Sequence, residues 1–279
     1  MTPAYTERDV EHFFDQTLQN YLGFWDSDGV LHTGYFSDTD TDTDYRAAAE
    51  RTSAVLAADA GIDSSSYVLD VGCGCGNFLT YLAERFNCGG EGLDLSEERI
   101  KFAQRRLAGD DRRLRIGFRH GSATQLPYET GTFSHVVSQD ALFLVPDKPR
   151  SHVEMYRVLK PGGVVALSDF LQPTQTISER AREHVYDRVR WSGGYSLTEY
   201  RAALEAAGFE IIAARDLDRH IRRTYEVLGG TASQRAETTA DSAAREWMLA
   251  FAKSCAEIET AIDHGEFGWG MITARKPTA

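Results

Sequence analysis

The sequence predicts an α/β protein with a doubly wound parallel sheet, and three observations support this fold class. Apolar runs typical of buried strands alternate with helical patterns from residue 67 to residue 169. A turn with glycine at every second position follows the first of these strands. A Pro161-Gly162-Gly163 run ends one helical pattern directly before another apolar strand.

The first strand, Tyr67–Val71, leads into a turn from Gly72 to Gly76, and a helix is expected over Asn77–Phe86. Glycine tolerates positive φ and leaves room for a ligand against the backbone. The free N–H groups at the start of the next helix favour a nucleotide-like ligand with negative charge. A dinucleotide-binding turn would need glycine where Asn77 stands, so a nicotinamide oxidoreductase is a weaker alternative.

The next strand is expected over residues 90–96 and carries an acid, Asp94, near its carboxyl end. An acid about 20 residues past a glycine-rich turn accepts hydrogen bonds from ribose hydroxyls in nucleotide-binding folds. Asp94 also suits the start of a helix, because Ser96 and two glutamates follow it. Both roles are compatible, since the strand ends where the helix begins.

Two further buried strands are expected over residues 135–138 and 164–169. Cationic residues and the Pro161-Gly162-Gly163 run end the helix between them. Ligands of such sheets bind outside the carboxyl ends of the strands. The ligand is therefore expected at this edge of the sheet.

The pattern Asp70-x-Gly72-x-Gly74-x-Gly76, the acid Asp94 and the 157–169 block resemble motifs of class I S-adenosylmethionine (SAM) dependent methyltransferases. The resemblance covers roughly residues 60–215. It implies SAM as the cofactor and a Rossmann-like, seven-stranded sheet whose last strand is antiparallel. It also implies a set of cofactor-binding residues, namely Asp70, Gly72, Gly74, Gly76, Asp94, Leu95, Ser122, Ala123 and Gln139. The family commonly has an acid at the position of Ser122, where it faces the adenine amino group.

Outside this core, helices are expected over residues 9–22, 45–58, 178–190 and 197–207, a mostly helical run over 219–262, and strands over 209–214 and 267–274. The sequence therefore predicts three parts. Residues 1–58 form an N-terminal helical cap, residues 59–218 and 264–279 form the SAM-binding core, and residues 219–263 form a helical insertion. The cap and the insertion are expected to cover the ligand-binding edge and to form the pocket for the methyl acceptor.

Aromatic residues of these covering segments are expected to face the methyl acceptor, because ring faces stabilise cations. A basic cluster over residues 219–225 would bind a carboxylate or diphosphate, unless it is a solvated helix face. His32 and His220 are candidate bases for an acceptor that must lose a proton, although either is alternatively a surface or core histidine. The candidate acceptor-binding residues are Tyr21, Trp25, Tyr35, Trp191, Arg219, Arg223 and Tyr225.

The net charge of −12, from 30 Lys and Arg against 42 Asp and Glu, disfavours nucleic acid or an anionic membrane as partner. No apolar run approaches the ~20 residues that span a bilayer, and a cytoplasmic location is expected. Cys73-x-Cys75 has no matching Cys or His pair elsewhere, so no metal site is expected. The oligomeric state stays open.

Within the class, Ser138-Gln139-Asp140-Ala141 and the closing segment around Trp269 look like sarcosine/dimethylglycine N-methyltransferases. Residues 31–36 also resemble tocopherol-type and prenyl-diphosphate C-methyltransferases. The resemblance implies methyl transfer to a small, anionic molecule, with N-methylation of a small amino acid as the leading expectation. C-methylation of a prenyl diphosphate or related alkene is the alternative, and a SAM-binding module without catalysis is an alternative of another class.

Overall fold

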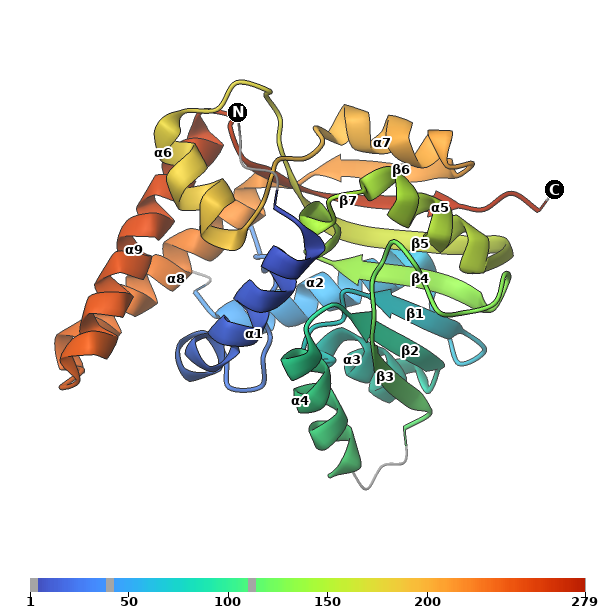
Figure 1. The fold of residues 1–279 in the computed structure, drawn as a ribbon, viewed down its shortest axis with the longest axis horizontal. Helices are drawn as coiled ribbons and strands as arrows, with labels where there is room; N and C mark the ends of the chain where they lie inside the picture. Colours follow the sequence, from blue (N-terminus) through green and yellow to red (C-terminus); the bar gives the residue numbers. More distant parts are fainter. Residues whose placement is uncertain (1–4, 39–42, 110–113, 279) are drawn as a thin grey trace.

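The structure, a computed structural model, describes residues 5–38, 43–109 and 114–278. Its centre is a seven-stranded sheet with the order β3-β2-β1-β4-β5-β7-β6 (Figure 1). β7 runs antiparallel to β5 and β6, and the other neighbouring pairs are parallel, which confirms the predicted fold class. The strands are β1 (Tyr67–Val71), β2 (Gly89–Asp94), β3 (Ile116–His120), β4 (Phe133–Gln139), β5 (Leu159–Leu171), β6 (Glu210–Asp216) and β7 (Gly268–Arg275).

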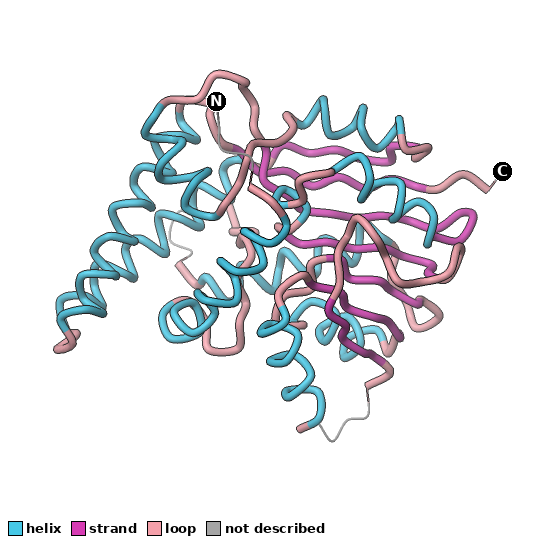
Figure 2. The backbone as a smooth tube through the Cα atoms, in the orientation of Figure 1, coloured by secondary structure: helices cyan, strands magenta, loops and turns pink. Residues whose placement is uncertain are grey.

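Helices surround the sheet, and Figure 2 shows them in cyan around the magenta strands. Two of the longer helices, α3 (Asn77–Phe86) and α4 (Glu97–Ala108), pack against strands β1 to β3, and α2 (Tyr45–Ala60) packs against β5 and β7. Two follow later in the chain: α5 (Lys148–Val158) and α7 (Leu197–Ala206). The remaining long helices are α1 (Glu7–Phe24), α8 (Asp218–Thr238) and α9 (Ser242–Asp263).

Two hydrophobic cores lie on opposite faces of the sheet, because successive side chains of a strand alternate between its faces. Val68 of β1 belongs to one core and Leu69 to the other. Val137 and Val136 of β4 divide in the same way. Burial on both faces explains why these central strands read as continuous apolar runs in the sequence.

The structure corrects one expected helix and divides another helical segment in two. The helix expected over 178–190 consists of three short turns of different pitch: α6 (Glu179–Ala181), the π-turn η2 (Arg182–Tyr186) and the 3₁₀ turn η3 (Asp187–Val189). Arg190, with a left-handed backbone, ends them. The mostly helical run expected over 219–262 consists of two helices, α8 and α9, because Asp241 accepts hydrogen bonds from two backbone N–H groups and starts a new helix.

Helix α1 and the later helices α8 and α9 lie on the side to which the parallel strands point (Figure 1). Phe24, at the end of α1, packs against Trp247 and Phe251 of α9, with ring centroids 4.9 and 5.1 Å away. Arg235 of α8 donates a hydrogen bond to the Phe24 carbonyl oxygen at 2.6 Å. Among the described residues, no helix is both long and apolar enough to cross a bilayer.

Candidate functional site

The glycine-rich turn after β1 is shaped by positive φ angles at Gly72, Gly74 and Gly76, which are 75°, 54° and 79°. A Cβ on Gly72 would lie 2.3 Å from the Cβ of Ala141, so the turn packs tightly against the end of β4. A Cβ on Gly74 would meet nothing nearer than a nitrogen of Arg99 at 3.6 Å. The backbone at Gly74 is therefore the part of the turn that leaves room for a ligand.

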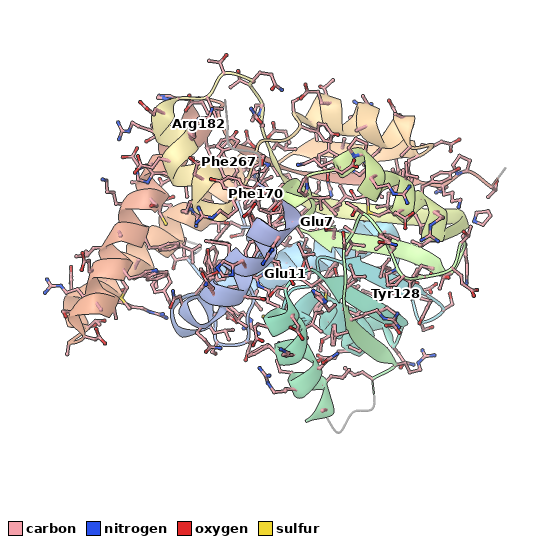
Figure 3. All side chains as sticks on the ribbon, viewed as in Figure 1. Glu7, Glu11, Tyr128, Phe170, Arg182 and Phe267 are labelled. Atoms are coloured by element: carbon pink, nitrogen blue, oxygen red, sulfur yellow. The ribbon has the colours of Figure 1, made fainter. Side chains whose placement is uncertain are left out.

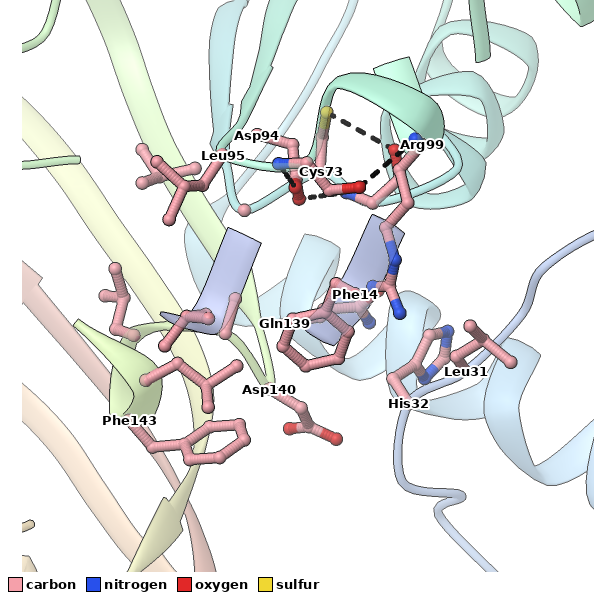
Figure 4. A pocket seen from close by; sticks show the side chains of 18 of the residues that line it. Phe14, Leu31, His32, Cys73, Asp94, Leu95, Arg99, Gln139, Asp140 and Phe143 are labelled. Carbon is pink, nitrogen blue, oxygen red and sulfur yellow. Dashed lines mark hydrogen bonds between the residues drawn. The ribbon is translucent and has the colours of Figure 1, made fainter. Parts of the chain in front are cut away.

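Asp94 stands at the end of β2, and its carboxylate is fixed by backbone groups on both sides (Figure 4). One oxygen accepts a hydrogen bond from Gly74 N at 2.8 Å, and the other accepts one from Ser96 N at 2.8 Å. Ser96 itself caps α4. Asp94 thus holds the residue that caps α4 and also lines the pocket, so one carboxylate is placed for both expected roles.

Asp70 lies beneath the turn and is almost completely buried. One of its carboxylate oxygens has no hydrogen-bond partner among the described residues. Burial, with Asp94 nearby, raises the pKa of Asp70 to about 8. A buried carboxyl beside a second acid favours a ligand that brings positive charge, because that charge offsets both effects.

One pocket runs from this turn to the covering helices. On the turn side it is lined by all but one of the predicted cofactor-binding residues, namely Asp70, Gly72, Gly74, Asp94, Leu95, Ser122, Ala123 and Gln139. On the far side it is lined by four predicted residues, Tyr21, Trp25, His32 and Tyr225, and by others that include Leu31, Phe143, Phe170 and Arg188.

Gly76 is the exception on the turn side, because it caps α3 from outside the pocket. A Cβ there would lie 2.5 Å from the ring of Phe118. Its role is therefore to let the turn pack on β3, and the prediction of direct cofactor contact is corrected.

His32 lies in the loop between α1 and α2, beside Leu31 and across from Asp140 (Figure 4). Its Nδ1 is 3.3 Å from the carbonyl oxygen of Thr33, so a proton on Nδ1 leaves Nε2 free to accept one. Burial lowers the pKa of His32, although Asp140 acts in the opposite direction. His32 is therefore neutral near pH 7 and suited to proton abstraction.

Asp140 follows β4 and has a φ of 49°, which is uncommon for a residue other than glycine. Its carboxylate accepts hydrogen bonds from Thr33 N at 2.6 Å, Ser168 Oγ at 2.7 Å and Trp269 Nε1 at 2.7 Å. These bonds hold the loop that carries His32 against the end of the sheet. Sequence reasoning quoted Asp140 only within a motif and missed this anchoring position.

Arg188, from η3, lines the far side of the pocket and was not predicted. Its Nε donates to the carbonyl oxygen of His184 at 3.1 Å, and Nη2 donates to the Tyr225 hydroxyl at 3.3 Å. Within the described ranges, no Asp or Glu forms an ion pair with it. Burial raises the pKa of Tyr225 to about 12, so that hydroxyl stays neutral beside the guanidinium. A pocket cation without a counter-ion favours an anionic ligand.

Residues 68–163 match the family model of the methyltransferase domain. The chain is 31% identical over 220 residues to phosphoethanolamine N-methyltransferase 1 of Triticum aestivum. This match covers 75% of this chain but only 41% of that relative. It is 29% identical to the 27-O-demethylrifamycin SV methyltransferase of Amycolatopsis mediterranei, over 88% of this chain and 90% of that relative.

The chain belongs to the class I SAM-dependent methyltransferases.

A solved structure from Galdieria sulphuraria, described as a proposed sarcosine dimethylglycine methyltransferase, shares the fold of this methyltransferase. The TM-score is 0.83, the identity is 23%, and the match covers 95% of this chain and 99% of that one. The described pocket fits SAM as cofactor in three respects. Gly74 leaves the backbone open, Asp94 offers carboxylate oxygens, and Asp70 has an unpartnered oxygen in reach of positive charge.

The basic cluster of this methyltransferase lies outside the pocket, which corrects its predicted contact with the methyl acceptor. Arg219 is 60% exposed at its side chain and forms an ion pair with Asp38 at 2.5 Å. Arg223 forms an ion pair with Glu226 at 2.8 Å on the same helix. The cluster is therefore the ion-paired helix face that was its alternative interpretation.

His220 and Tyr35 also lie outside the pocket, and their rings stack with centroids 3.9 Å apart. His220 is buried, and its Nδ1 accepts a hydrogen bond from Phe36 N at 3.1 Å. Burial lowers the pKa of His220 to about 4, so it is neutral. These contacts attach the loop after α1 to α8, and the prediction of a catalytic His220 is corrected to a structural one.

Trp191 is fully buried and does not reach the pocket. It stacks on Tyr186 with ring centroids 4.3 Å apart and meets the edge of Phe143 at 5.4 Å. Phe143 does line the pocket. Trp191 thus supports a pocket wall from behind, where direct contact with the methyl acceptor was predicted.

Proposed function

We propose that this methyltransferase methylates the nitrogen of a small amine that also carries an anionic group, such as the amino acids sarcosine and dimethylglycine. The observation that carries the proposal is Arg188, a pocket cation that no described acid neutralises. It takes the role that the sequence assigned to Arg219 and Arg223. A carboxylate or phosphate bound at Arg188 would orient the amine toward the turn side of the pocket.

The residues beside Arg188 suit an amine. SAM supplies an electrophilic methyl group on a sulfonium when it is bound. His32 accepts the proton that an ammonium group must lose before its lone pair can react. Aromatic rings of Tyr21, Trp25 and Phe143 line the same space and stabilise the positive charge of the methylated amine, at ~0.5–2 kcal/mol for each favourable ring.

Two of the similar proteins support an anionic amine. The wheat relative is named for phosphoethanolamine, and the Galdieria protein is named for sarcosine and dimethylglycine, so both names specify an amine with an acidic group. The chain spans only 41% of the wheat relative's length, and the likeness to the Galdieria protein concerns the fold. The choice of methyl acceptor therefore rests on the pocket.

C-methylation of a prenyl diphosphate or related alkene is the second candidate. Leu31, Phe143 and Phe170 favour it, because they make part of the wall apolar. Arg188 would then face a diphosphate, and His32 would remove the proton after methylation. The two candidates differ in the part of the acceptor that contacts the pocket wall, which is a small amine in the first and an alkene chain in the second.

The test is incubation with SAM that carries a deuterated methyl group and two acceptor panels, followed by mass spectrometry. The amine panel holds sarcosine, dimethylglycine and phosphoethanolamine, and the alkene panel holds geranyl diphosphate and shorter prenyl diphosphates. The proposal expects the label on an amine. Label only on an alkene would overturn it in favour of the second candidate, and SAM binding without transfer to either panel would favour a non-catalytic SAM-binding module.

A further inference from the structure

Glu7 of α1 reaches across to the loop that follows β3. Its Oε1 accepts hydrogen bonds from Ser122 Oγ at 2.6 Å and from Thr124 Oγ1 at 3.1 Å. Ser122 Oγ in turn accepts a hydrogen bond from Thr124 N at 3.0 Å. The two hydroxyls therefore hold one carboxylate oxygen in place, while Oε2 has no hydrogen bond to the described residues. Figure 3 labels Glu7 and Glu11 where α1 crosses the strand ends.

The order of the strands decides which part of a SAM molecule would meet Glu7. β2, with Asp94, lies between β1, with the glycine-rich turn, and β3. A ligand whose ribose meets Asp94 and whose methyl group points to the far side of the pocket has its base over β3. There the pocket is lined by Leu95, Ala123 and Glu7. Two apolar side chains suit the faces of a purine, and a carboxylate suits its amino edge.

The loop itself offers no carboxylate, because Gly121, Ser122, Ala123 and Thr124 are all neutral. We infer that Glu7 of α1 binds the exocyclic amino group of the adenine, through the oxygen that Ser122 and Thr124 leave free. Ser122, predicted to contact the adenine, instead positions Glu7. This inference rests on the proposed function, because it requires SAM in the described pocket.

The position of Glu7 ties base recognition to α1, which other contacts also hold over the strand ends. Asp15 accepts a hydrogen bond from Ser96 Oγ at 2.5 Å, and Glu11 lies 3.2 Å from His120 Nε2. Phe14 packs under the guanidinium of Arg99 at 4.3 Å. Adenine binding and the docking of α1 therefore stabilise each other.

Two ligands separate recognition of the amino group from docking of α1. S-adenosylhomocysteine carries the amino group, and its deaminated analogue S-inosylhomocysteine has a carbonyl oxygen there. Calorimetry with the full chain should show that the wild type prefers S-adenosylhomocysteine at least about tenfold, because a charge-assisted hydrogen bond is replaced by repulsion. Glu7→Ala should reduce this ratio to near one. Glu7→Gln, which keeps the shape of the side chain, should also reduce it.

Asp15→Ala is the matched control, because Asp15 holds the same helix through Ser96 and does not line the pocket. It should weaken both ligands by the same factor and preserve the ratio. A ratio that Glu7→Ala leaves unchanged would overturn the inference, as would a wild-type ratio near one. Either result would still be consistent with SAM binding in the described pocket. A wild type that binds neither ligand would overturn the inference and the proposed function together.

Discussion

Asp70 shows how burial of one residue makes the fold sensitive to pH. Its pKa is raised to about 8 by burial and by Asp94, whereas an unfolded chain restores a value near ~3.9. The folded state therefore holds more protons between these values, and the free energy of unfolding falls as the pH rises through this range. Asp169, with a pKa raised to about 7 mainly by burial, acts in the same direction.

We predict that Asp70→Asn stabilises the ligand-free protein at pH 8 and flattens its pH dependence. The neutral amide has no proton to lose, so it removes the slope that Asp70 contributes between pH 6.5 and 8, up to ~1.4 kcal/mol per pH unit. Thermal unfolding across this range measures the effect. A slope as steep in the variant as in the wild type would contradict the assignment to Asp70.

The second prediction for single residues compares Arg188 in the pocket with Arg219 on the surface. Arg188→Met removes a cation from the pocket, so the acceptor KM should rise about tenfold or more while SAM affinity stays the same. Arg219→Met removes a cation of the same type from the ion-paired surface and should leave both constants unchanged. Steady-state kinetics with an acceptor found in the amine panel would measure the acceptor KM of both variants. Equal effects of the two substitutions would refute the role of Arg188.

At the scale of elements, the buried strands were the most predictable part. β1 and β5 read as strands because apolar residues fill both faces, as in Val68 and Leu69. β3 was not recognised because it is an edge strand of five residues and only Phe118 is buried in it. The turns over 179–189 and the break between α8 and α9 depend on packing and local hydrogen bonds that periodicity alone does not encode.

The turn after β1 supplies the prediction at this scale. Gly72→Ala should destabilise the protein by about 1–3 kcal/mol beyond its backbone strain, because the new Cβ would lie 2.3 Å from that of Ala141. Gly61→Ala is the control, since Gly61 also has positive φ but a Cβ there meets nothing within 4 Å. It should cost only the strain of the left-handed backbone, roughly 1–2 kcal/mol. Urea unfolding compares the two, and equal losses would contradict the close packing.

At the scale of the whole molecule, the two sides of the pocket differ in how well the sequence predicts them. The turn side follows from local sequence order, because Gly72, Gly74 and Asp94 end neighbouring strands and must meet at one edge. The far side depends on how α8 and the turns before α7 rotate in the fold. That rotation points Arg219 outward and Arg188 inward. The division into cap, core and insertion stays a prediction.

The fold also brings segments that are far apart in the sequence together at the pocket. α1 contributes Glu7 and Tyr21, and α8 contributes Tyr225, to a single cavity above the strand ends. The cavity contains Arg99 and Arg188 within a protein whose net charge is −12. The same cavity is lined by Glu7, Glu11, Asp70, Asp94 and Asp140. Arg188 is therefore a local position for an anionic group inside a mainly acidic pocket.

The central claim is that SAM binds with its ribose at Asp94, and calorimetric titration of SAM tests it most directly. Asp94→Ala should weaken binding about tenfold or more, because two carboxylate oxygens at the end of β2 are lost. Arg219→Ala, on the surface, should bind like the wild type. Equal SAM affinity of Asp94→Ala and the wild type, with both proteins folded, would contradict the claim.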